Sequence, residues 1–309
     1  MKVLLSKINK KYLKIFLAIT TLISINKSSA SNYFDTLKRK KIIISSLSSV
    51  YISNMGALYK LWYKDYEGSP FHFYDDSRHW MAMDKAGHAF SSFVESKFSY
   101  QMFKWAGYSH KKALILGCSY SFIYQNTFEI FDAYSAEWGF SIADVAANTF
   151  GSGLVLSQQL LWNENRILIK YSYQPSPFIK IRPETFGENF YQNLLKDYNG
   201  QTYWLNFNLK SLLNYSKIPD WLDVSIGYGA NGMYGGKDNI YIKDGKTYNF
   251  NNTPRVYEIY LAPDINLERL HIEKKWLKIA LNILNSYKVP LPALKYTQNR
   301  SLKFIPIMF

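Results

Sequence analysis

The chain has 309 residues, of which 48% are hydrophobic and 17% aromatic, and it carries a formal net charge of +14. It is long enough to form one large domain or two ordinary ones. Its single cysteine excludes an intramolecular disulfide and a metal site built from several cysteines, and the lack of a nucleic-acid-binding motif argues against a nucleic-acid partner despite the basic charge.

Residues 1–30 have the pattern of an export signal. The first 14 residues are rich in lysine, the segment IFLAITTLISI at 15–25 is apolar, and SSA at 28–30 offers small side chains for cleavage. We predict a signal peptide over 1–30, removed after Ala30, and therefore an exported protein of the periplasm or outer membrane of a bacterial cell envelope. An uncleaved N-terminal anchor is the alternative interpretation.

Residues 31–170 are predicted to form a helical domain. It contains three uncharged segments, which lie at 42–59, 113–128 and 145–162. Each is near or just below the ~20 residues that span a bilayer and contains polar side chains, so buried helices of a bundle and membrane spans both fit. The segments hold Cys118, which we expect to be buried, and four glycines that would let helices approach closely. These are Gly56, Gly117, Gly151 and Gly153.

Polar residues recur in pairs at helical spacing in this region. The pairs are Asp84 with His88, Glu129 with Asp132, and Asp144 with Asn148. Residues three or four apart share one face of a helix, so each pair would present two polar groups together. If the three faces converge, they form a cluster of four carboxylates, one imidazole and one amide, with Lys85 and Ser141 beside it. Such groups suit Zn, Mn or Fe, and a carboxylate beside a histidine also suits acid–base catalysis.

Structural roles compete with these chemical ones. Asp84 could cap a helix that begins at Lys85, and SIAD at 141–144 has the form of a capping box before an apolar segment. Lys85 could pair with Glu129 and Asp132, or its long side chain could reach the surface. Under these interpretations the polar groups would fix helix packing and bind nothing.

A divalent metal is possible at the set formed by Asp84, His88, Glu129 and Asp132, although we expect no resident cofactor. The preceding loop, FHFYDDSRHWMAM at 71–83, offers a second set of candidate cation ligands. These are His72, Asp75, Asp76 and His79. For this loop we favour a solvated segment lined by aromatic residues.

Residues 171–309 are predicted to form a β-rich domain. Five segments show strand-like alternation or are rich in aromatic and β-branched residues, and Gly, Asn, Asp and Pro separate them. They are RILIKYSYQ, QTYWLNFNLK, WLDVSIGYGANGMYG, PRVYEIYLAP and SLKFIPIMF. Apolar residues at helical spacing predict one interrupting helix at 265–287. The expected fold class is therefore α+β, with an N-terminal helical bundle followed by an antiparallel β-rich region.

The last of these segments ends in Phe309, a feature that resembles the final strand of bacterial outer-membrane β-barrel proteins. About six strand candidates are fewer than the roughly eight strands of the smallest such barrels, and Pro306 argues against a central strand. A small open sheet packed on the helical domain and a sheet associated with the outer membrane are both compatible with the pattern.

DKAGHAF at 84–90 and EIFDAYSAEWGFSIADVAANTFGSG at 129–153 together resemble the YfiM-like family of predicted periplasmic lipoproteins of unknown function. They are similar, more distantly, to the VanZ-like membrane family. The similarity covers about residues 77–162. The matching positions are Asp84, Lys85, His88, Glu129, Asp132, Gly139, Ser141, Asp144, Asn148 and Gly151. The resemblance implies no established reaction, and the chain departs from the family in lacking a cysteine near the cleavage site for lipid attachment.

The residues and the resemblance together favour an exported cell-envelope protein that is structural or binding, not enzymatic. Its polar cluster would fix helix packing, and its β-rich region would contact membrane lipid or another envelope protein. The alternative is an envelope enzyme that acts on a lipid or glycan. In that case the set Asp84, His88, Glu129 and Asp132 would bind a metal or act as acid and base.

Overall fold

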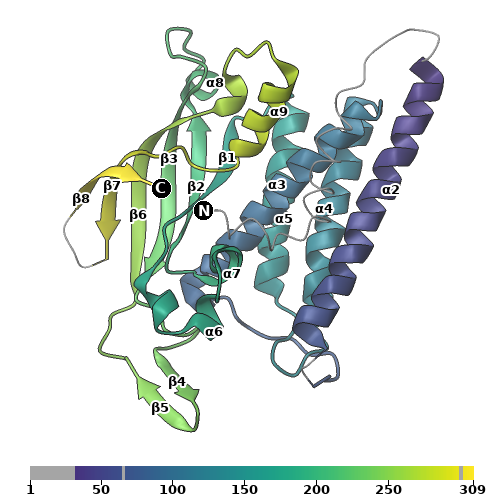
Figure 1. Ribbon diagram of the computed structural model, residues 1–309. Helices are drawn as coiled ribbons and strands as arrows, with labels where there is room; N and C mark the ends of the chain where they lie inside the picture. The colour runs from purple at the N-terminus through teal and green to yellow at the C-terminus, as the bar shows by residue number, and fades with distance from the viewer. Residues whose placement is uncertain (1–31, 65–66, 299–301) are drawn as a thin grey trace, which may run out of the picture.

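The computed structural model describes residues 32–64, 67–298 and 302–309, so the predicted signal peptide lies outside the described residues. A helical bundle occupies one side of the molecule and an antiparallel sheet the other (Figure 1). This arrangement confirms the predicted α+β class.

The bundle is built from long helices that contain the predicted uncharged segments. They are α2 (Asn32–Leu58), α3 (Met83–Trp105), α4 (His110–Asp132) and α5 (Ile142–Trp162). The short helices η2 (Tyr59–Tyr63) and η3 (His79–Ala82) lie between α2 and α3. α3 packs on both α4 and α5, and α2 runs along the outer side of the bundle (Figure 1). Within the described ranges, no helix is long and apolar enough to cross a membrane.

Two glycines allow the close approach of helices to α3. A Cβ atom added to Gly151 would lie 2.2 Å from the carbonyl oxygen of Ala89, and one added to Gly117 would lie 2.4 Å from a backbone nitrogen of α3. Side chains larger than hydrogen therefore do not fit at these crossings. Among the described residues, Gly56 and Gly153 have no atom of another element within 4 Å of such a Cβ, so the expectation that they serve helix packing is wrong.

The sheet has six antiparallel strands in the order β1-β2-β3-β6-β7-β8, and β4 and β5 form a separate hairpin. The strands are β1 (Ile167–Tyr173), β2 (Gln201–Asn208), β3 (Leu222–Asn231), β4 (Ile240–Lys243), β5 (Lys246–Asn249), β6 (Val256–Ile265), β7 (Leu291–Thr297) and β8 (Lys303–Met308). All five predicted strand segments are confirmed. The predicted domain boundary between residues 170 and 171 falls inside β1, and the division into two domains stays a prediction.

Strand β7 was missed by the sequence pattern because prolines flank and interrupt it. Pro292 lies where the pairing with β8 shifts register, between Leu291 and Ala293. On its other side β7 pairs with β6 only from Leu294 onward. No ladder hydrogen bond is therefore demanded from Pro292, and a proline is tolerated there.

The predicted helix at 265–287 is shorter in the structure. Ile265 still belongs to β6, paired with Leu222, and the helix α9 covers only Lys275–Leu284. The remaining short helices of this half connect the strands. They are η4 (Pro177–Lys180), α6 (Pro183–Phe186), α7 (Phe190–Lys196), α8 (Leu209–Leu213) and η5 (Leu267–Arg269).

The bundle and the sheet meet through a shared hydrophobic core. Cys118 is buried there, as predicted, beside Phe93 of α3 and Leu168 of β1. Phe90 of α3 packs against the rings of Tyr171 and Tyr203. α3 thus covers one face of the sheet at β1 and β2.

The opposite face of the sheet carries buried charge. The side chains of Lys170, Asp264 and Lys288 have no exposed surface. Nζ of Lys170 lies 2.8 Å, and Nζ of Lys288 3.3 Å, from carboxylate oxygens of Asp264. Both ammonium groups also donate to backbone carbonyls, for example that of Ile265 at 3.0 Å from Lys170. Charges buried in this way are tolerated because each has a partner.

Candidate functional site

The polar residues predicted to converge lie together where α3 and α5 begin and α4 ends. They are Asp84, Lys85 and His88 of α3, Glu129 and Asp132 of α4, Ser141, which precedes α5, and Asp144 and Asn148 of α5. We call these residues, together with Asp76 from the loop before α3, the polar cluster. Polar residues that form three separate pairs in the sequence therefore occupy one site.

Local backbone geometry fixes where the two helices begin. The Ser141 hydroxyl accepts a hydrogen bond from the backbone N–H of Asp144 at 3.1 Å and donates one to Asp76 at 2.6 Å. The predicted capping role of Ser141 is therefore confirmed. α3 begins at Met83, after left-handed backbone at Trp80–Ala82. Asp84 is thus in the first turn and is not the N-cap that the sequence suggested.

Lys85 lies among three carboxylates. Its Nζ is 2.7 Å from Asp76, 3.0 Å from Asp84 and 2.8 Å from Asp144. Burial by itself would lower the pKa of Lys85, but Asp84 and Asp144 outweigh burial and raise it. These contacts replace the predicted pairing with the acids of α4. Lys85 therefore stays charged and ties α3 to α5 and to the preceding loop.

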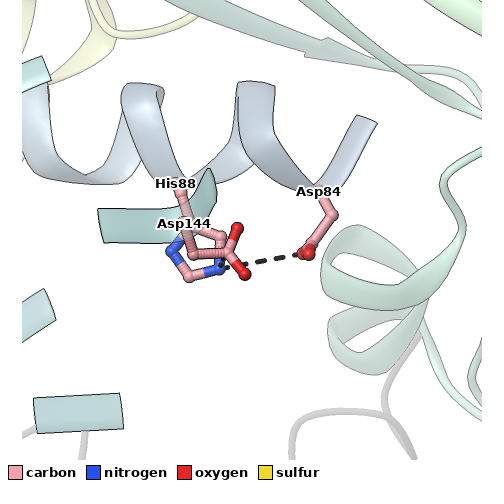
Figure 2. Close-up of side chains that lie close together, drawn as sticks. All are labelled: Asp84, His88 and Asp144. Atoms are coloured by element: carbon pink, nitrogen blue, oxygen red, sulfur yellow. Dashed lines mark ion pairs between the residues drawn. The ribbon is translucent and has the colours of Figure 1, made fainter. Parts of the chain in front are cut away.

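His88 contacts all three helices of the cluster. Its Nε2 atom lies 3.5 Å from Oδ1 of Asp144 and 3.8 Å from Oδ1 of Asp84. Its Nδ1 atom lies 3.2 Å from Oδ1 of Asn148 and 3.8 Å from Oε1 of Glu129. Asp84, His88 and Asp144 turn toward one another (Figure 2). His88 is thus the point at which the three predicted faces meet.

Of the two acids of α4, Glu129 is buried and Asp132 is partly buried. Glu129 is 1% exposed, and its Oε2 atom has no hydrogen-bond partner within the described residues. Burial, with a smaller contribution from Asp144 and Asp132, raises the pKa of Glu129 to about 9. Asp132 accepts a hydrogen bond from the Tyr63 hydroxyl, yet burial raises its pKa to about 6. Glu129 is therefore protonated at neutral pH.

Asp84 and Asp144 differ in how their surroundings treat a negative charge. Burial raises the pKa of Asp144 to about 6, although His88 and Lys85 act to lower it. Burial also acts to raise the pKa of Asp84, but there His88 and Lys85 outweigh it and the pKa is lowered. Asp84 also accepts a hydrogen bond from the Tyr198 hydroxyl at 2.9 Å. Asp84 is therefore the more strongly ionised of the two carboxylates.

The prediction that the loop at 71–83 is solvated is correct only in part. Asp75 accepts a hydrogen bond from the backbone N–H of Ser77 at 3.1 Å in an exposed position. His72 contacts the carbonyl oxygen of Trp138 at 2.5 Å. Asp76, in contrast, joins the polar cluster through Lys85.

The sequence pattern did not predict the roles of Tyr63 and Tyr198, because both are distant in sequence from the acids to which they donate hydrogen bonds.

Carboxyl groups outnumber basic groups in the polar cluster. Asp76, Asp84, Glu129, Asp132 and Asp144 face the two basic side chains Lys85 and His88. One ligand atom from each of Asp84, His88 and Asp144 lies within 4.8 Å of the others. This set differs from the predicted one, since Asp144 takes the place of Glu129 and Asp132. The arrangement can hold a cation or exchange protons.

Residues 72–159 match the family model described as predicted periplasmic lipoprotein (DUF2279). The match confirms the resemblance to a family of predicted periplasmic lipoproteins, and it spans every member of the polar cluster. The more distant similarity to VanZ-like proteins stays a prediction. No curated protein and no solved structure matches the chain. The family description fits an exported protein of the periplasm.

Proposed function

We propose that this chain is a non-enzymatic protein of the cell envelope that binds the lipid surface of a membrane through the exposed part of its sheet. The family description supports export to the periplasm. The observation that carries the proposal is the distribution of side chains over the sheet. Antiparallel sheets that face water usually bury an apolar face and expose a polar one. On β3, β6, β7 and β8 this sheet instead exposes apolar side chains, and on β3, β6 and β7 it buries polar ones.

An apolar row crosses the exposed part of the sheet. Ile226 of β3 pairs with Leu261 of β6, Leu261 with Leu294 of β7, and Leu294 with Phe304 of β8. These four side chains are between 39% and 65% exposed. The same row continues into β2 at Leu205, which packs against the bundle core. The row is therefore one apolar face of which α3 covers only part.

A second row lies beside the first. Ile259 of β6 pairs with Tyr228 of β3 and Tyr296 of β7, and Tyr257 follows two residues away on β6. We call the exposed set of both rows the sheet patch. It consists of Ile226, Tyr257, Ile259, Leu261, Leu294, Tyr296 and Phe304. Contiguous apolar patches on a protein surface mark contact with a membrane or a partner.

Tyrosine and lysine side chains favour a lipid surface as the occupant. Tyr257 and Tyr296 combine an apolar ring with a polar hydroxyl, which suits the boundary between headgroups and acyl chains. Helix α9 has apolar residues on one face, yet none of its residues is buried. It exposes Trp276 together with Lys275 and Lys278. Basic amphipathic helices of this kind bind anionic lipid.

Vesicle flotation tests the proposal. The exported chain would be mixed with vesicles of phosphatidylethanolamine and phosphatidylglycerol, and the fraction that floats would be measured. We expect wild type to float and the triple variant Ile259→Ser/Leu261→Ser/Leu294→Ser to lose at least four-fifths of that binding. The variant should fold, since the replaced side chains are already exposed.

The matched control is Leu195→Ser/Leu213→Ser/Ile242→Ser, which removes three apolar side chains outside the sheet patch that are more exposed than the three replaced within it. It should float like wild type. Equal flotation of the sheet-patch variant and wild type would contradict the proposal. So would a wild type that ignores vesicles and is captured instead by another envelope protein.

An envelope enzyme acting on a lipid or glycan is a second candidate, and one observation favours it. Burial raises the pKa of Asp144 to about 6, and His88 lies 3.5 Å away with part of its ring exposed. Groups with pKa values close to the working pH exchange protons most effectively. Product formation from isolated envelope lipid or glycan, lost in His88→Gln, would support this candidate over the binding function.

A further inference from the structure

The spacing of three ligand atoms in the polar cluster matches that around a single metal ion. Two ligands at about 2.1 Å from an ion in tetrahedral geometry lie about 3.4 Å apart. The Nε2 atom of His88 lies 3.5 Å from Oδ1 of Asp144 and 3.8 Å from Oδ1 of Asp84. All three atoms lie within 4.8 Å of one another, so side-chain rotation would have to close the remaining distance around one ion.

The cluster has buried carboxylate oxygens that lack hydrogen bonds. Oδ1 of Asp144, in a side chain that is 5% exposed, is ion-paired with the Lys85 ammonium at 2.8 Å and has no further hydrogen-bond partner within the described residues. The same atom faces Nε2 of His88. Oε2 of Glu129, on the other side of the ring, has no hydrogen-bond partner within the described part of the chain. A buried oxygen without a partner, such as Oε2 of Glu129, is costly unless a ligand satisfies it.

Neighbouring side chains orient the three ligands. The carbonyl oxygen of Asn148 can only accept, so Nδ1 of His88 donates to it at 3.2 Å, and Nε2 is the ring nitrogen that faces the carboxylates and would bind an ion. Tyr198 donates to Oδ1 of Asp84 at 2.9 Å. Lys85 donates to Oδ2 of both carboxylates, at 3.0 Å and 2.9 Å. Partners that fix the tautomer and orientation of metal ligands are typical of metal sites.

We propose that Asp84, His88 and Asp144 bind one divalent transition-metal ion, with Zn²⁺ or Mn²⁺ as the matching chemistry. One imidazole and two carboxylates suit these ions better than Ca²⁺ or Cu⁺. Lys85 neutralises one of the cluster's carboxylates and leaves the remaining excess of acid for the metal. The site lies in the bundle and does not involve the sheet patch, so it is independent of the proposed lipid contact.

Metal titration tests this site. The exported chain would be stripped with a chelator, and Zn²⁺ and Mn²⁺ would each be added against a chromophoric competitor. We expect one ion per chain for wild type and at least a tenfold weaker affinity for His88→Gln and Asp144→Asn. Metal should also raise the melting temperature of wild type and leave those of the two variants unchanged.

The matched control is His110→Gln. His110 begins α4, roughly 30 Å along the helix from Asp132, and bonds to Tyr100 at 2.9 Å. It should bind metal like wild type. Circular dichroism of the metal-free variants shows whether each is folded, and His88→Gln decides the question if Asp144→Asn is not. Absence of saturable one-to-one binding by wild type, or unchanged affinity in folded His88→Gln, would overturn the proposal.

Discussion

The bundle and the sheet both bury charged side chains, but they balance the charge differently. In the sheet, Lys170 and Lys288 share Asp264, and Lys295 pairs with Glu258 at 2.6 Å. Positive and negative groups there are close to equal in number. In the polar cluster of the bundle, by contrast, carboxyl groups outnumber the basic side chains Lys85 and His88.

The difference separates a structural network from a candidate binding site. Lys170, Lys288 and Asp264 satisfy one another, whereas Asp223 on β3 keeps an Oδ2 atom without a partner in the described residues and a pKa raised by burial to about 6. A cluster with excess acid must keep some carboxyl groups protonated, leave oxygens without partners, or bind a cation. The bundle shows the first two of these features at Glu129. The third is the proposal tested by metal titration.

Replacing one carboxyl by an amide in each region should give the largest difference in stability between the sheet and the bundle. Asp264→Asn leaves two buried lysines without their carboxylate, so we expect a loss of about 3 to 5 kcal/mol in the free energy of unfolding. Glu129→Gln removes a carboxyl whose Oε2 atom has no hydrogen-bond partner among the described residues. Its effect should stay within about 1 kcal/mol of wild type. Urea denaturation of the metal-free proteins measures both.

Asp220→Asn is the control for the sheet substitution, because the Asp220 side chain, which pairs with Arg269, is 44% exposed. It should cost less than about 1 kcal/mol. A loss in Glu129→Gln as large as that in Asp264→Asn would show that the two regions do not differ in the way we describe.

A smaller effect is expected at the helix crossing that brings the cluster together. Gly151→Ala would place a Cβ 2.2 Å from the carbonyl oxygen of Ala89. Overpacking of this kind costs about 1 to 3 kcal/mol. Gly153→Ala, two residues away with open space around it, should be neutral or stabilising by up to about 1 kcal/mol. Thermal unfolding of the pair distinguishes packing from helix propensity, and equal melting temperatures would count against the close crossing.

The last expected effect concerns pH and a further acid of the bundle, Glu95. Burial raises the pKa of Glu95 to about 8, although Gln125 donates a hydrogen bond to it at 3.0 Å. The folded state thus keeps a proton that the unfolded state loses above its ordinary pKa. Stability should therefore fall as pH rises from about 4.5 to 8, by at most about 1.4 kcal/mol per pH unit from this group. Glu95→Gln should remove that part of the slope in denaturation curves, and an unchanged slope would mean that Glu95 is ionised in the folded protein.

Much of the fold could be predicted because the signals are local. Residues such as Ile42 to Tyr59 lack charges over several helical turns, and the SIAD sequence at 141–144 marks the start of α5. Five strands followed from alternation and turn residues. Strand β7 did not, because Pro292 is tolerated only through a register shift against β8 that the chain's own sequence does not reveal.

The candidate site could be predicted only in outline. The pairs Asp84–His88 and Asp144–Asn148 share helix faces because of helical periodicity, and this spacing can be read from residues close together in the chain. The partners of Lys85 could not be predicted in this way, because Asp144 lies 59 residues away in the sequence. The sequence therefore predicted convergence, but it paired Lys85 with the acids of α4. Its candidate metal set held Glu129 and Asp132, where the structure groups Asp144 with Asp84 and His88.

The sequence by itself determined the helices, most strands, the capped start of α5 and the polar faces, since each depends on residues close together in the chain. Only the tertiary structure decided which side of the sheet is covered. Alternation along a strand shows which residues share a face of the sheet. It does not show which of the two faces the rest of the protein covers. The packing of α3 on β1 and β2 alone leaves the apolar side of β3, β6, β7 and β8 exposed, while Lys170 and Asp264 are buried on the other side.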